Sequence, residues 1–148
     1  MGLDMHLSAR KYMSEFFEPK LRARVSAALG DMSLAERVNG VTLEAAYWRK
    51  ANAIHKWFVD NVQGGDDDCK EYYVRPEKLS DLVEVCQRVL KYPSMAPDVL
   101  PPQGGFFFGS TAIDEWYRKD LQNTIDMLTP LLPLAETGEF SFYYHSSW

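Results

Sequence analysis

Residues 47–74 read YWRKANAIHKWFVDNVQGGDDDCKEYYV, and the interpretation of the rest of the chain depends on this stretch. Four of its apolar side chains recur at helical spacing: Ala51, Ile54, Phe58 and Val62. The spacing predicts a helix over about 49–62 with one buried face. Gly64 and Gly65 end that helix, because glycine adopts the left-handed cap conformation at little steric cost. A strand over 69–75 follows.

The segments before this helix predict two more strands and one more helix. Residues 3–7 alternate between apolar and polar side chains, which predicts a strand lasting to about Tyr12. A helix begins near Pro19 and stops at Gly30. A short helix or loop is expected over residues 31–39, followed by a strand from Val41 to about Tyr47.

After residue 75 the chain predicts two helices and a last strand. Pro76 opens a helix with a regular apolar face. Four prolines between Tyr92 and Gln103 indicate an irregular loop. Thr111 and Asp114 have the spacing of a capping box, so a helix is expected from about 112. Residues 140–148 alternate as a strand. The expected fold is α+β: an antiparallel sheet of about four strands, with three main helices largely on one face.

Length and composition indicate one domain over residues 1–148. The chain is 46% hydrophobic and carries a net charge of -5, which argues against a protein that coats DNA or RNA. No apolar run has membrane-spanning length, and the two cysteines fit no zinc pattern. We therefore expect a cytoplasmic protein without cofactor, metal or membrane partner. Residues 10–24 have a local charge of +3 and residues 60–71 one of -4, a pairing that can join the subunits of a homodimer or higher even oligomer.

Trp48, Arg49, Asn52 and Lys56 are the best binding candidates. Positions 48, 52 and 56 lie one turn apart on the predicted helix. An indole offers a stacking platform, an arginine a fork for phosphate, and an asparagine a donor and acceptor for a base edge. This combination suits a nucleotide. The same pattern also fits a tryptophan at the rim of the core with solvated lysine and arginine side chains.

Other motifs carry weaker signals. Residues 104–111, GGFFFGST, have P-loop spacing but lack the lysine, so only an anion site at Ser110 and Thr111 remains. His55 is a candidate ligand contact, and a general base in the hydrolase alternative. No catalytic partner stands at fixed spacing, however, and a partly buried, hydrogen-bonded histidine fits the pattern better than a general base. The three acids at 66–68 fit a solvated turn better than a cation site.

Several of these words together resemble a family of small phage and prophage proteins: MGLDM, YWRKANAIHKWFV, QGG, YYV, GFFFGST, DEWY and the final SSW. The resemblance covers nearly the whole chain. It implies an accessory protein of the host bacterial cytoplasm and assigns no mechanism.

Combined, these observations predict a non-catalytic binder of a small nucleotide that sequesters a bacterial immune signal. One alternative is a protein that inhibits a host protein. The other is a small metal-dependent hydrolase that uses His55.

Overall fold

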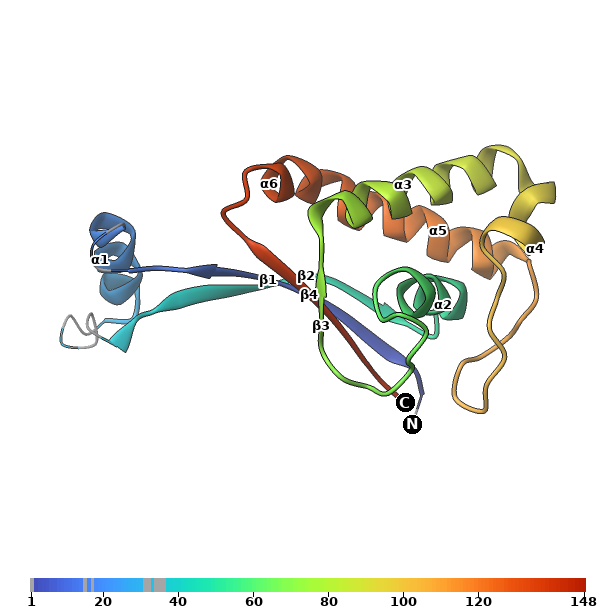
Figure 1. Cartoon of the computed structure of the whole chain (residues 1–148), viewed down its shortest axis with the longest axis horizontal. Helices are drawn as coiled ribbons and strands as arrows, with labels where there is room; N and C mark the ends of the chain where they lie inside the picture. Colours follow the sequence, from blue (N-terminus) through green and yellow to red (C-terminus); the bar gives the residue numbers. More distant parts are fainter. Residues whose placement is uncertain (1, 15, 17, 31–32, 34–36) are drawn as a thin grey trace.

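The computed structural model describes residues 2–14, 16, 18–30, 33 and 37–148. It confirms an α+β fold with one four-stranded antiparallel sheet, in the order β2-β1-β4-β3. The strands are β1 (Asp4–Tyr12), β2 (Gly40–Arg49), β3 (Tyr72–Val74) and β4 (Ser141–Ser147). Strands β1 and β4 are neighbours, with Asp4 opposite Ser147, so both chain ends lie together (Figure 1).

Three helices cover one face of this sheet, and together with the sheet they form the part of the molecule that we call the body. They are α2 (Asn52–Asn61), α3 (Pro76–Lys91) and α5 (Glu115–Leu128). Beneath them, β1 and the residue before it contribute Leu3, Met5, Leu7 and Ala9, which are fully buried, whereas His6 and Arg10 lie on the opposite face. This period of two is the alternation read from residues 3–7, so the sequence pattern identified the buried face.

The β1–β2 hairpin extends away from this body, and α1 (Pro19–Ala28) lies at its far end (Figure 1). We call the described residues between 10 and 43 the hairpin arm. Within α1 only Ser26 is buried. Large apolar side chains of the arm are exposed, including Phe16 at 84% and Tyr12 at 77%. Most of the prediction for residues 31–39 lies outside the described residues.

Two predicted helix starts are wrong. The central helix begins at Asn52 rather than near Arg49, because β2 continues to Arg49 and pairs Trp48 with Met5. Asp114 caps α5 alone by accepting from the backbone N–H groups of Trp116 and Tyr117, so the helix starts at Glu115 instead of 112.

The proline-rich segment is more regular than expected, because it contains a 3₁₀ turn, η2 (Pro93–Met95), and α4 (Ala96–Val99). A second 3₁₀ turn, η3 (Thr129–Leu131), and α6 (Leu132–Glu136) follow α5. Among the described residues, no helix is both long and apolar enough to cross a membrane.

Candidate functional site

A buried polar network centred on His55 joins α2 to the last strand. The imidazole has no solvent exposure. Its Nδ1 lies 2.8 Å from the Tyr144 hydroxyl, and its Nε2 lies 3.0 Å from a carboxylate oxygen of Asp67. Because a carboxylate can only accept, Nε2 donates to Asp67; when Nε2 carries the only ring proton, Nδ1 accepts the Tyr144 hydroxyl hydrogen. Burial raises the pKa of Tyr144 well above its ordinary value, which keeps this hydroxyl protonated.

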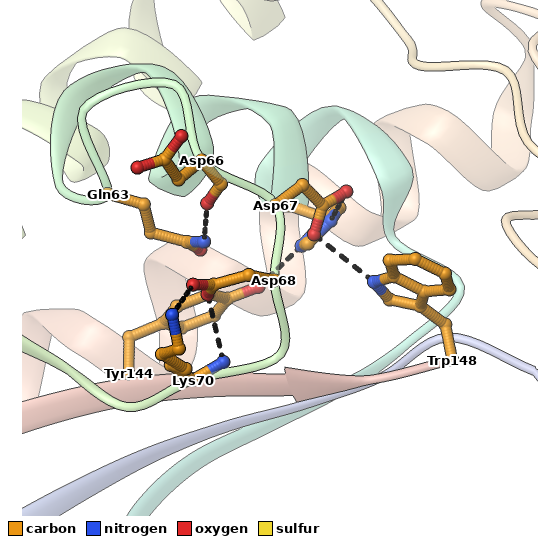
Figure 2. A network of polar contacts seen from close by, with 8 residues as sticks. Gln63, Asp66, Asp67, Asp68, Lys70, Tyr144 and Trp148 are labelled. Carbon is orange, nitrogen blue, oxygen red and sulfur yellow. Dashed lines mark hydrogen bonds and ion pairs between the residues drawn. The ribbon is translucent and has the colours of Figure 1, made fainter.

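The acidic turn belongs to the same network (Figure 2). The second carboxylate oxygen of Asp67 accepts from the Trp148 indole at 3.1 Å. Asp68 accepts from the backbone N–H of Lys70 and from the Tyr72 hydroxyl, and it forms an ion pair with the Lys70 ammonium. The hydrogen bond from Lys70 lowers the pKa of Asp68. The side chains of Asp67 and Asp68 therefore hold the acidic turn in place through hydrogen bonds to neighbouring segments.

This geometry gives His55 a structural role and removes it from the ligand-binding set. A general base must reach the proton that it abstracts, whereas both nitrogens of this enclosed ring already have protein partners. His6 and His145 stack on each other at 4.9 Å, on the sheet face away from the body helices. In the part of the chain that the structure describes, no three His, Cys, Asp or Glu side chains gather to form a metal site.

The strongest candidate for ligand binding is a cleft of about 300 Å³ between the β2–α2 connection and the start of α5. It is lined by residues from three separate segments: Arg49 and Lys50, Ser110, and Asp114, Trp116 and Asp120. Its volume is at the lower end of the range of about 300–1,000 Å³ for small-molecule sites. The size suits one nucleotide better than two joined nucleotides.

Lys50 connects the strand to the helix in a strained conformation. Its φ is +59°, which is uncommon for a residue with a side chain. The backbone is held there because the Lys50 N–H donates to the Leu3 carbonyl at 2.8 Å. A side chain at Gly2 or Gly109 would meet the Lys50 side chain at 3.0 Å or 3.5 Å. Strain of this kind is concentrated at binding sites, and here it presents Lys50 beside Arg49.

Asn52 supports the cleft through hydrogen bonds to the loop that carries Ser110. Its amide donates to the Phe108 and Ser110 carbonyls at 2.9 and 2.8 Å, and its oxygen accepts from the Gln103 N–H at 3.2 Å. The side chain is 5% exposed. Asn52 therefore holds the loop that carries Ser110 against α2, and it has little capacity left for a base edge.

Helix α5 supplies an indole and two acids. The Trp116 indole is 71% exposed, and the Lys119 ammonium lies 5.2 Å from its ring centre. Asp114 caps the helix, whereas the Asp120 carboxylate has no hydrogen bond or ion pair to any residue that the structure describes. Burial, and then the charge of Asp114, raise the pKa of Asp120 to about 6 against the opposing effect of Lys119. A partly enclosed carboxylate with a perturbed pKa is a mark of a functional site.

The cleft contains only some of the candidates from the sequence. Arg49, Asn52 and Ser110 line it. Trp48 is 4% exposed and donates to the Thr124 hydroxyl, so it is no stacking platform. Lys56 forms an ion pair with Asp60 at 2.7 Å, and neither Lys56 nor Thr111 lines the cleft.

Comparison of the chain with protein-family models, with curated proteins and with solved structures finds no match.

Four residues that line the cleft are not among the candidates from the sequence: Lys50, Asp114, Trp116 and Asp120. For Trp116 the signal was available, because an exposed tryptophan next to a helix cap stands in the DEWY motif. For Asp120 there is none, because only the packing of α5 against β2 and α2 brings it to the same cleft as Arg49.

Proposed function

We propose that this protein is a non-catalytic binder of a small nucleotide, and that the cleft between the β2–α2 connection and α5 is its site. One observation supports the proposal: two basic residues, Arg49 and Lys50, line the same cleft as the exposed Trp116. A phosphate pairs with the bases, and a nucleobase stacks on the indole.

Both basic groups are available to a ligand. Arg49 is 62% exposed, and its one ion pair with a residue that the structure describes, Asp4, is long at 3.9 Å. Lys50 has no ion pair among the described residues. Because neither cation is committed to a close carboxylate, a bound phosphate gains their attraction without first breaking a strong contact.

The biological role that we propose is the capture of a nucleotide signal of bacterial immunity in the host cytoplasm. It rests on the nucleotide site together with the resemblance to phage proteins. Binding without turnover is sufficient for this role, since sequestration requires only affinity.

Inhibition of a host protein is the second candidate function, and the hairpin arm favours it. The arm exposes Tyr12, Phe16 and Leu29, of which Leu29 is 60% accessible. Aromatic residues of this kind are enriched in protein interfaces.

Thermal unfolding with added ligands separates the two functions. A nucleoside monophosphate at about 100 times its dissociation constant should stabilise the fold by about 2.7 kcal/mol. An unchanged unfolding temperature with every common nucleoside monophosphate at millimolar concentration would contradict nucleotide binding and leave the host-protein interaction as the account to test.

A further inference from the structure

We propose that the cleft selects guanine nucleotides, because Asp120 offers its carboxylate to the two adjacent N–H donors on the edge of that base. This inference rests on the proposed nucleotide site and names the ligand class that the site takes.

The positions of Trp116 and Asp120 on α5 provide the geometry. They are four residues apart, so they share one face of the helix, separated by about one turn or 5.4 Å. Both line the cleft. A base stacked on the Trp116 indole therefore directs one edge along the helix toward the Asp120 carboxylate. Its sugar and phosphate extend to the other wall, where Arg49 and Lys50 lie.

The Asp120 carboxylate can also accept hydrogen bonds from a ligand. Among the described residues it has no hydrogen-bond or ion-pair partner, although the residue is partly buried. Burial and the charge of Asp114 oppose its ionisation and raise its pKa to about 6. A ligand that donates two hydrogen bonds compensates for this lost solvation, because hydrogen bonds to a charged acceptor are the strong ones.

Among the common bases only guanine presents two adjacent donors, the ring N1–H and the exocyclic N2–H₂. Adenine and cytosine each place an amino group beside a ring nitrogen that can only accept, and that nitrogen repels a carboxylate. Uracil and thymine place their N–H between two carbonyl oxygens. Donor and acceptor matching at a buried carboxylate thus distinguishes guanine from the rest.

Calorimetric titration of the purified protein at neutral pH tests this selection. The probes are the 5′-monophosphates of guanosine, inosine, adenosine and xanthosine. We expect guanosine monophosphate to bind on the order of 10- to 100-fold more tightly than the adenosine compound, since two charge-assisted hydrogen bonds are lost with adenine. Inosine monophosphate, which lacks the N2 amino group, should lie between them.

The Asp120→Asn variant provides the sharper test. A carboxamide offers one acceptor and one donor, which match the N1–H and the C2 carbonyl of xanthine. The variant should lose its preference for guanine and prefer xanthosine monophosphate over guanosine monophosphate. Asp126→Asn is the matched control on the same helix, because the exposed Asp126 carboxylate accepts from Gln122 and does not line the cleft. Its preference should equal that of the unmodified protein.

The outcomes separate the two proposals. Equal affinities for all four nucleotides, or an Asp120→Asn variant that still prefers guanine, overturn the base selection and leave nucleotide binding in place. Absence of binding to any of the four overturns both. Unfolding curves of the two variants, measured in parallel, confirm that a change in preference comes from a folded protein.

Discussion

Arg49 is the residue whose side chain tests the phosphate end of the cleft. It lies at the end of β2, outside the hydrophobic core, and is 62% exposed. Arg49→Ala should weaken a nucleoside monophosphate by about 2 kcal/mol, as expected for the loss of a charge-assisted hydrogen bond. The free energy of unfolding should change little, because no core contact is removed. Calorimetric titration measures the first quantity and chemical denaturation the second.

Arg75→Ala is the matched control for this variant. Arg75 is 64% exposed and has a similarly long contact, 3.7 Å to Glu77, but it does not line the cleft. Its replacement should leave nucleotide affinity unchanged. An Arg49→Ala protein that unfolds would give Arg49 a role in the fold, and one that binds as tightly as Arg75→Ala would place Arg49 outside the site.

Asp120 predicts a stability that depends on pH. Its pKa in the folded chain is raised from 3.8 to about 6, so the folded state holds the proton more tightly than the unfolded state. The stability that protonation contributes is complete below about pH 4 and is lost as the pH rises through about 6. The carboxamide of an Asp120→Asn variant cannot ionise. The variant should therefore melt at a higher temperature than the unmodified protein at pH 8 and near the same temperature at about pH 4.

Melting curves at the two pH values provide this measurement. Asp126→Asn, at an exposed carboxylate on the same helix, is the matched control for these curves. An equal difference between Asp120→Asn and the unmodified protein at both pH values would show that the Asp120 carboxylate is not perturbed.

At the scale of elements, the sequence predicted what local periodicity controls. The apolar spacing from Leu79 to Leu90 correctly predicts the buried face of α3, because this spacing depends on one helix alone. The start of α2 was placed too early. Residues 46–49 satisfy a strand and a helix pattern equally well, and the choice is made by pairing with β1, where Ala46 faces Leu7.

Only part of the candidate site could be predicted, because local sequence patterns do not encode contacts between distant segments. Arg49 and Asn52 are identified by residue type, although the end of a strand and the start of a helix, not one helix face, bring them to the cleft. Trp48 was selected for its indole, yet strand periodicity directs that indole into the core. The roles of Lys50 and Asp120 depend on the contact between α5 and the β2–α2 connection, which no local pattern encodes.

The His55 network predicts how firmly α2 is joined to β4. His55→Ala removes the partners of the Tyr144 hydroxyl and of one Asp67 oxygen in the interior. It should lower the free energy of unfolding by about 3 kcal/mol, the cost of buried polar groups left unpaired together with the cavity. Denaturant titration measures the change. His6→Ala, at a side chain that is 33% exposed on the opposite sheet face, is the control and should cost much less. Equal losses for both variants would contradict the structural role of His55.

At the scale of the whole molecule, we predict a homodimer or a higher even oligomer. The hairpin arm extends from the body with Tyr12 and Phe16 exposed, and β2 is an edge strand of the sheet that the described residues form. Unpaired edges and exposed aromatic side chains favour association. Residues 10–24 also have a local charge of +3, and residues 60–71 have one of -4. Sedimentation should therefore give a multiple of the chain mass of 17.0 kDa. A monomer at micromolar concentration would contradict this assembly, although the cleft, formed within one chain, would remain.

The central claim, that the cleft binds a nucleotide against Trp116, is tested most directly by the tryptophan side-chain N–H signals in a nuclear magnetic resonance titration. The chain has 4 tryptophans. Trp48 donates to Thr124, Trp148 donates to Asp67, and Trp57 is 7% exposed, whereas Trp116 lines the cleft and is 71% exposed. A Trp116→Phe variant assigns its signal. On addition of guanosine monophosphate, the Trp116 signal should shift progressively to saturation while the other three move little. A Trp116 signal that stays in place at millimolar nucleotide would contradict the claim.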